Sequence, residues 1–376
     1  MDLLVPRYGE GSLSDVVPSL LAGLGVPGAV DVLGVSGPAR VCVLLVDGLG
    51  WRLLREHGED APFLSSLAGR AITAGFPATT ASSLAALGTG APTGEHGLVG
   101  FSFAEGGELL NALRWSRYDA AGHVDLRESL VPESVQLRRT AFEAAAGAGV
   151  AVRLVLPREH EGSGLTRAAL RGGRFEAVLG FGDLVSRVGR ALRSADRVLC
   201  YAYHGDLDAL GHVYGPSSEP WRWQLRFVDR VAEAIAAGLP EGGALVVTAD
   251  HGMVTAGERV DLDTVGGLRE GVRAVAGEAR VRHVYTDTPD DVRERWLSVL
   301  GERVWLVSRA EAVAAGWFGP RVAGHVLPRI GDLVVAARDS LVLVRSEAER
   351  FQAGFTGHHG SLTAVEQEVP LLVAGR

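Results

Sequence analysis

The chain contains 376 residues with a mass of 39.6 kDa, and its formal net charge at pH 7 is −8. Hydrophobic residues make up 47% of the sequence and charged residues 22%, which is typical of a folded globular protein and excludes an intrinsically disordered chain. The negative charge argues against partners that are nucleic-acid polymers, because surfaces that bind them concentrate positive charge. It does not exclude a small anionic ligand, since a bound metal ion can reverse the local field.

The first residues, MDLLVPRYGEGSLSDVV, carry acidic side chains early and have no basic segment ahead of an apolar one, so we expect no signal peptide. No run approaches the roughly 18 apolar residues of a membrane span. We therefore expect a cytoplasmic protein that has no membrane partner. Cys42 and Cys200 each lie within an apolar segment, where buried thiols are more common than a disulfide.

Six short apolar segments follow one another along the chain, separated by stretches long enough for crossover helices. Strands that are apolar throughout indicate burial on both faces, as in a parallel sheet covered by helices. The sequence thus predicts an α/β fold with a mostly parallel central sheet flanked by helices. The six segments are VCVLLVD (41–47), AITAGF (71–76), VAVRLVL (150–156), RVLCYAYH (197–204), ALVVTAD (244–250) and VPLLVAG (369–375).

Residues 254–355 differ in character from the rest of the chain. Strand-like pieces (RHVYTD, RVWLVS, DLVVAA and LVLV) are mixed with acidic, helix-like ones such as DTPDDVRERWLSVL. We expect a smaller inserted α+β lobe here, lying over the functional site. The remaining residues, 1–253 and 356–376, are expected to form the core.

Carboxylate and imidazole side chains stand at the ends of several of these segments. In a parallel sheet the carboxyl ends of the strands meet at one edge, where functional groups collect. Mixed oxygen and imidazole donors are a ligand set that zinc accepts. The residues are Asp47, Asp208 with His212, Asp250 with His251, and His358 with His359.

Each fragment alone has an ordinary structural explanation. An Asp after a strand often caps a helix or forms a turn. Asp208 and His212, at positions i and i+4, could share a simple hydrogen bond on one helix face. Their occurrence together at successive strand ends favours a metal site.

Five segments carry a family resemblance: VDGLG, FPATTASSLAALGTGAPTGEHG, DLDALGHVYGP, VVTADHGM and GHHG, spread in this order over residues 41 to 360. In this combination they resemble the alkaline phosphatase superfamily, specifically its nucleotide pyrophosphatase/phosphodiesterase branch. The resemblance implies two divalent metal ions, with zinc expected and Mn²⁺ or Mg²⁺ as alternatives. It places one ion on Asp47, Thr80, Asp250 and His251, and the other on Asp208, His212 and His359.

The resemblance also implies a nucleophile, Thr80 rather than Thr79, counted back from Thr89-Gly90 in the family pattern. It selects His359 over His358 because the family histidine directly precedes glycine. A threonine hydroxyl is a poor nucleophile at neutral pH, but metal coordination and a helix N-terminus both favour its ionised form. The implied reaction is hydrolysis of a phosphodiester or nucleotide pyrophosphate through a covalent phospho-threonine.

Two positions depart from the pattern of diesterase relatives. Ala81 follows the nucleophile where a bulky aromatic is usual, and Phe101 stands near the usual place of a phosphate-binding asparagine. Asn111, in ELLNALRW, could substitute for that asparagine, although a surface helix is the expected structure there. Phe101 and Asn111 are thus candidate substrate contacts. Arg158 and Arg329 are candidate cations for a substrate with more charge.

The substrate class therefore stays open among small phosphate esters. A phosphodiester or nucleotide pyrophosphate is the first choice, and a phosphomonoester or phosphonate is the alternative. Sulfatase and phosphoglycerate mutase activities are disfavoured because the nucleophile is Thr80. A catalytically silent metal-binding homologue would have lost a ligand or the nucleophile, and none is lost. The sequence does not indicate an oligomeric state.

Overall fold

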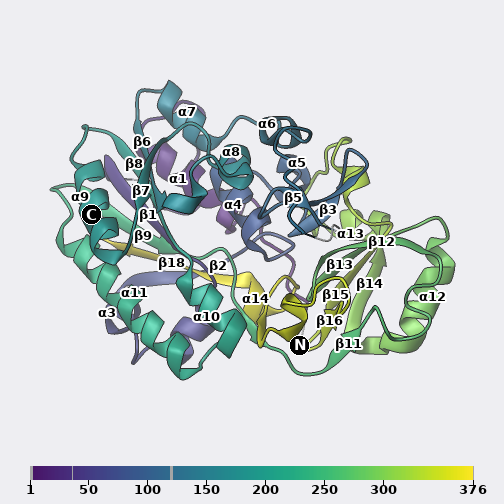
Figure 1. The fold of residues 1–376 in the computed structure, drawn as a ribbon. Helices are drawn as coiled ribbons and strands as arrows, with labels where there is room; N and C mark the ends of the chain where they lie inside the picture. Colours follow the sequence, from purple (N-terminus) through teal and green to yellow (C-terminus); the bar gives the residue numbers. More distant parts are fainter. Residues whose placement is uncertain (1–2, 36, 119–121, 376) are drawn as a thin grey trace.

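The computed structural model describes residues 3–35, 37–118 and 122–375. A seven-stranded sheet with helices on both faces forms the centre of these residues (Figure 1). Neighbouring strands run parallel except at β18, which is antiparallel to both of its neighbours, so the predicted mostly parallel α/β sheet is confirmed. The strand order is β2 (Ala68–Thr73), β18 (Glu368–Ala374), β9 (Gly243–Thr248), β1 (Arg40–Val46), β8 (Val198–His204), β6 (Ala151–Pro157) and β7 (Arg174–Val178).

The central strands are apolar because they are covered on both faces. Every residue of β1 after Arg40 is buried, and so is every residue of β9. The edge strand β7 was not predicted, since its sequence RFEAV is short and two of its five residues are charged. The register pairs Val46 of β1 with His204 of β8, and Leu45 of β1 with Thr248 of β9. The segments that follow β1, β8 and β9 therefore leave the sheet at the same edge.

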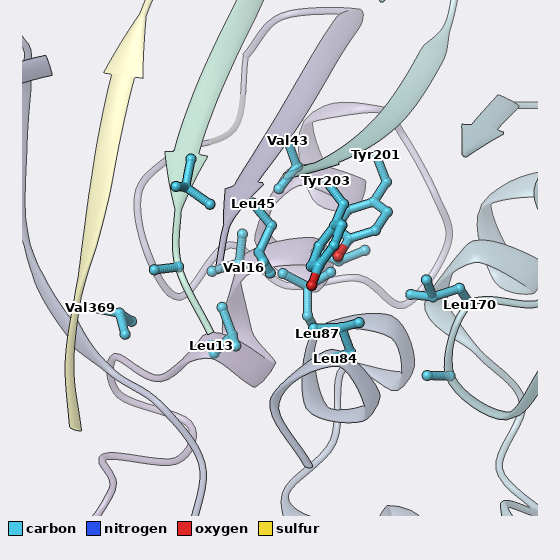
Figure 2. Packing of buried hydrophobic residues seen from close by; sticks show 14 of the residues in the cluster. Leu13, Val16, Val43, Leu45, Leu84, Leu87, Leu170, Tyr201, Tyr203 and Val369 are labelled. Carbon is cyan, nitrogen blue, oxygen red and sulfur yellow. The ribbon is translucent and has the colours of Figure 1, made fainter. Parts of the chain in front are cut away.

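Two groups of helices cover the sheet (Figure 1). The first contains α1 (Val16–Gly23), α4 (Thr80–Thr89), α6 (Pro132–Val135), α7 (Ala141–Gly147) and α8 (Gly164–Ala169), and the second contains α3 (Pro62–Ser66), α9 (Phe181–Leu192), α10 (Asp206–Tyr214) and α11 (Glu219–Ala237). Figure 2 shows how α4 sits against the sheet: Leu84 and Leu87 lie near Leu45 and Tyr203. This packing fixes the helix whose first residue is Thr80. Three shorter helices are α2 (Trp51–Glu56), α5 (Thr93–His96) and α14 (Ala364–Gln367).

Residues 254–355 contain a second sheet with its own hydrophobic cluster. This four-stranded antiparallel sheet has the order β12 (Val272–Glu278), β13 (Val281–Thr286), β15 (Leu333–Ala337) and β14 (Val304–Ser308), and it is accompanied by α12 (Pro289–Leu300) and α13 (Arg309–Ala314). It lies beside the core, on the right of Figure 1. Small pairs are β10 (Val254–Thr255) with β17 (Gly357–His358) and β11 (Arg259–Asp261) with β16 (Val342–Val344).

A three-stranded sheet follows α5: β3 (Ser102–Glu105), β4 (Glu108–Asn111) and β5 (Ser116–Arg117). It replaces the surface helix expected over ELLNALRW, and that expectation is wrong. The reason is a hairpin: the turn Gly106-Gly107, with both residues at positive φ, reverses the chain and pairs ELLN with SFAE.

The two cysteines lie directly opposite each other in the core. Cys42 of β1 and Cys200 of β8 are register partners, and both are buried free thiols, as expected from their apolar segments. None of the helices in the described ranges is long and apolar enough to cross a membrane.

Candidate metal centre and nucleophile

The first group of metal-binding side chains lies where β1 and β9 end. Asp47 follows β1, and Asp250 and His251 follow β9, the strand next to it. His251 Nε2 lies 3.4 Å from Asp47 Oδ1 and 3.3 Å from Asp250 Oδ2, and the three side chains are nearly or completely buried. Adjacent parallel strands thus bring together residues separated by about two hundred positions in sequence.

The second group comes from α10 and from the loop after β17. Asp208 and His212 share one face of α10, with His212 Nε2 at 3.3 Å from Asp208 Oδ2. His359 Nε2 lies 3.2 Å from His212 Nε2 and 4.0 Å from Asp208 Oδ1. The rings of His359 and His251 stack with their centroids 3.5 Å apart, so the two groups adjoin.

Thr80 lies beside the first group, at the first residue of α4. Its Oγ1 is 3.5 Å from Asp47 Oδ2 and 3.3 Å from His251 Nε2. The helix is ten residues long, so its N-terminal amide groups favour negative charge on this hydroxyl. The seven side chains singled out in the sequence, Thr80 and six carboxylates and imidazoles, therefore meet in one place.

The orientation of these side chains fits two cations. All three imidazoles place Nδ1 near a backbone carbonyl, of Gly252 for His251, Gly357 for His212 and Ala78 for His359, at 3.0, 2.8 and 2.9 Å. A histidine that donates from Nδ1 directs the lone pair of Nε2 at a metal. Each carboxylate has one buried oxygen without a hydrogen-bond partner among the described residues: Asp47 Oδ1, Asp208 Oδ1 and Asp250 Oδ2.

The pKa values of these buried carboxyl and imidazole groups also bear on metal binding. Burial, together with the charges of Asp250 and Asp208, raises the pKa of Asp47 well above its usual value. Burial lowers the pKa of His359 well below its usual value, which leaves that imidazole neutral and able to ligate. At His212 the effect of burial is outweighed by the Asp208 charge, which raises the pKa to about 9, so a metal ion there would displace a proton. A pair of divalent cations would stabilise the ionised carboxylates that burial otherwise disfavours.

Two neighbours of the site make contacts with proposed site residues that the sequence did not reveal. Tyr203 of β8 donates a hydrogen bond of 2.5 Å to Asp47 Oδ2. Burial, followed by the nearby Asp47 charge, raises the pKa of Tyr203, so its hydroxyl keeps the proton that it donates. Alternation along β8 could have indicated Tyr203, because it faces α4 two residues after Tyr201.

Glu278, the last residue of β12, is the other neighbour. It accepts a hydrogen bond of 3.2 Å from Thr79 Oγ1 and lies 3.7 Å from His359 Nδ1. Thr79 occupies the N-cap position of α4, but its side chain makes no capping bond. Burial raises the pKa of Glu278 to about 8. Nothing in the local sequence marks Glu278, since only the tertiary fold brings β12 to the core.

Two cavities flank Thr80. The first, of about 340 Å³, is lined by the candidate substrate contact Phe101 and by His358, which lies outside the two metal-binding groups. The second, of about 320 Å³, is lined by Tyr203. Thr80 borders both.

The other sequence candidates lie elsewhere. Asn111 is a buried strand residue whose Oδ1 accepts a hydrogen bond from the Arg114 amide, and it lines neither cavity. It therefore does not reach the substrate space directly, because the hairpin turns it inward. Arg329 is buried in an ion pair with Glu105, and the exposed Arg158 lines neither cavity.

Known proteins provide an independent comparison. The family model described as type I phosphodiesterase / nucleotide pyrophosphatase matches residues 41–362. A comparison with curated proteins finds no matching sequence. Similar solved structures include murine ectonucleotide pyrophosphatase/phosphodiesterase 5, at 17% identity and a TM-score of 0.66, with 90% of this chain and 88% of that chain covered.

Two further structures share the fold. An inactive threonine-to-alanine variant of the murine protein, in complex with AMP, has 16% identity and a TM-score of 0.67, with 89% of this chain and 88% of that chain covered. Phosphonoacetate hydrolase from Sinorhizobium meliloti 1021, in complex with phosphonoacetate, has 20% identity and a TM-score of 0.66, with 89% and 90% covered. Since the family model spans most of the sequence, this chain belongs to the type I phosphodiesterase / nucleotide pyrophosphatase family.

Proposed function

We propose that this protein is a two-metal hydrolase that cleaves phosphodiester or nucleotide pyrophosphate bonds through a phospho-threonine on Thr80. The observation that carries the proposal is the position of the Thr80 hydroxyl. It lies within 3.5 Å of Asp47 and His251, at a helix N-terminus, and it borders both cavities. The inactive threonine-to-alanine variant of the murine relative supports this choice of nucleophile by analogy.

The proposed step is a displacement at phosphorus. The Thr80 oxygen forms a bond to phosphorus while the bond to the ester oxygen breaks, and the leaving oxygen gains a proton as Thr80 loses one. Water then cleaves the phospho-threonine and restores the hydroxyl. Tyr203 holds Asp47 in place throughout by its hydrogen bond to Oδ2.

Two divalent ions would be held by the two groups already described. Asp47, Asp250, His251 and Thr80 would hold one, and the other would be held by Asp208, His212 and His359. When bound, the ions supply charge neutralisation for the phosphate oxygens and lower the barrier to ionising a hydroxyl. We propose zinc, because imidazole and carboxylate together suit it, with Mn²⁺ or Mg²⁺ as alternatives.

The two cavities support a diester over a monoester, because a diester has two organic substituents and a monoester has one. Phosphonate hydrolysis is the second candidate. The similarity of the fold to phosphonoacetate hydrolase favours it, as does the absence of a bulky aromatic residue at Ala81.

We propose that residues 254–355 form a lobe that completes the site over the core of residues 1–253 and 356–376. Support comes from Glu278, Glu349 and Phe351, which belong to these residues and line the first cavity together with core residues. Cavities of this size suit a small substrate better than a nucleic-acid polymer.

The test compares Thr80→Ala with Thr79→Ala in protein loaded with zinc. Activity is measured with bis(4-nitrophenyl) phosphate, 4-nitrophenyl phosphate and phosphonoacetate, and bound metal is measured by elemental analysis. We expect two metals per wild-type chain, diester activity, a loss of at least about 1,000-fold in Thr80→Ala, and a much smaller loss in Thr79→Ala.

Three results contradict the proposal. Full activity in Thr80→Ala would refute the assignment of Thr80 as the nucleophile. A wild-type chain that binds no metal would refute the two-metal mechanism. Activity confined to 4-nitrophenyl phosphate or to phosphonoacetate would show that the substrate is a monoester or a phosphonate and not a diester.

A further inference from the structure

The two cavities beside Thr80 differ in chemistry. The first has an aromatic and aliphatic wall that includes Phe101, Phe351, Phe355 and Val213. Phe351 is 72% exposed and Val213 is 50% exposed, so this wall is open to an apolar group from solvent. Beside five leucines, the second cavity is lined by polar and charged side chains, among them His123, Arg127, Glu159, His160, Glu161 and Ser163.

Arg114 lies between these cavities and is an exposed residue that lines both. Besides Thr80, only its neighbour Leu113 does the same among the described residues. No ion pair or side-chain hydrogen bond links the Arg114 guanidinium to any residue in the described ranges. It is therefore a cation at the reaction centre that is available to a substrate.

Three of the charged residues around Arg114 have other partners or a proposed role, while Glu159 and Glu161 of the second cavity are solvent-exposed. Glu349, which lines the first cavity, makes a two-pronged ion pair with Arg282, at 2.6 and 2.9 Å. Arg127, in the second cavity, is bound by Asp125. Asp208 belongs to the proposed metal site.

The turn that carries Arg114 is held firmly. Asn111 Oδ1 accepts a hydrogen bond of 3.0 Å from the Arg114 amide. The next residue, Trp115, has φ +52, a left-handed conformation that a bulky side chain rarely adopts. Its ring is fully buried, its Nε1 donates a hydrogen bond of 2.6 Å to Leu130 O, and it packs so closely on Gly164 that a Cβ there would lie 2.2 Å from Trp115 Cγ. Strained backbone that tertiary packing maintains is a feature of ligand-binding sites.

The net charge of the proposed metal site indicates a role for the Arg114 guanidinium. Two divalent ions and the three ligand carboxylates leave one net positive charge before Thr80 ionises. A singly charged phosphodiester balances that charge by itself. A substrate with a further negative group next to the scissile phosphorus needs another cation, and Arg114 supplies one where the two cavities meet Thr80.

We propose that Arg114 determines substrate specificity by binding a second anionic group of the substrate, a phosphate or a carboxylate on one ester substituent, while the aromatic cavity receives an apolar group. This inference rests on the proposed function. Asn111 and Trp115 act as positioning residues, because they hold the turn that presents the guanidinium.

The test uses the 4-nitrophenyl esters of thymidine 5′-monophosphate and thymidine 5′-diphosphate, which differ by one phosphate, with products separated by chromatography. The wild type should have a lower KM for the diphosphate ester. Arg114→Ala should lower kcat/KM for that ester about 10- to 100-fold, mainly through KM, and change the monophosphate ester by less than about 3-fold. Arg114→Lys should recover part of the loss.

Arg158→Ala is the matched control, since Arg158 is an exposed arginine that lines neither cavity, and it should change neither ester. The unfolding temperature of Arg114→Ala should equal that of the wild type. Equal losses on both esters, or no loss on either, would overturn the proposal for Arg114 while Thr80-dependent hydrolysis persists. Failure of the proposed function is distinct, because it would abolish dependence on Thr80 or on metal in the wild type itself.

Discussion

Gly48, the residue after Asp47, connects backbone conformation to the proposed metal site. Its φ is +73, and a Cβ built on it would lie 3.0 Å from Asp208 Cβ, 3.1 Å from Asp208 Cα and 3.1 Å from Asp208 Oδ1. Gly48→Ala therefore has two costs, a left-handed backbone for an L-residue and a steric contact with a proposed metal ligand. Because the Asp208 backbone is also in contact, rotating its side chain does not relieve the clash.

The two costs can be separated by a control. Gly316 has φ +74, and a Cβ there would meet nothing within 4 Å. Gly316→Ala thus has only the backbone cost, about 1 to 2 kcal/mol, which lowers Tm by a few degrees. Gly48→Ala should show at least this decrease in Tm, together with displacement of Asp208 by a few tenths of an ångström.

We expect Gly48→Ala to weaken the metal held by Asp208, His212 and His359 by at least about 10- to 100-fold, the range seen when a ligand's support is removed. Titration with zinc, followed by elemental analysis after dialysis, should give one tightly bound ion instead of two, with a matching loss of kcat/KM. Gly316→Ala should retain both. Two tightly bound ions and unchanged kcat/KM in Gly48→Ala would refute the reasoning.

Three further predictions concern hydrogen bonds and charge. Tyr203→Phe removes the hydrogen bond to Asp47 Oδ2 and should lower zinc affinity and kcat/KM about 10-fold, whereas an unchanged zinc titration would show that Asp47 is held without it. Tyr201→Phe, on the same strand, removes a buried hydroxyl that has no partner among the described residues. The free energy of unfolding of this variant should be unchanged or higher by about 1 kcal/mol. A clear destabilisation would reveal a hydrogen-bond partner. Asp60 accepts hydrogen bonds from Arg222 and Arg226, which lower its pKa in the folded state. The contribution of the Asp60 carboxylate to folding stability is therefore fully present above about pH 4 and is lost as pH falls below the folded-state pKa. The difference in the free energy of unfolding between wild type and Asp60→Asn, measured in urea, should be larger at pH 7 than at pH 3. A difference independent of pH would contradict this.

Local sequence was sufficient to predict the core of the fold and the grouping of the candidate site. The segments ending at Asp47 and Asp250 are continuously apolar, and this property identifies central parallel strands whose ends converge. The motif from Asp208 to His212 needs only helical geometry to face one direction. The roles of these residues and of Thr80 stay proposals.

What could not be predicted depends on contacts distant in sequence. The edge strand β7 and the hairpin around Asn111 have weak local patterns, and tertiary pairing determines their structure. Glu278 reaches Thr79 across 199 positions, and Arg114 becomes notable only when two cavities are seen to share it. Cavities, unlike strands, have no signature in consecutive residues.

The most direct test of the central claim is to trap the phospho-enzyme. Because the chain contains no lysine, trypsin cleaves only after arginine and leaves Thr79 and Thr80 in one peptide, residues 71–114. The zinc-loaded enzyme is mixed with bis(4-nitrophenyl) phosphate, quenched in acid within milliseconds and analysed by peptide fragmentation. We predict a 4-nitrophenyl phosphate group attached to the Thr80 oxygen and none attached to Thr79. Turnover under the same conditions with Thr80 unmodified, or with the group on Thr79, would contradict the account.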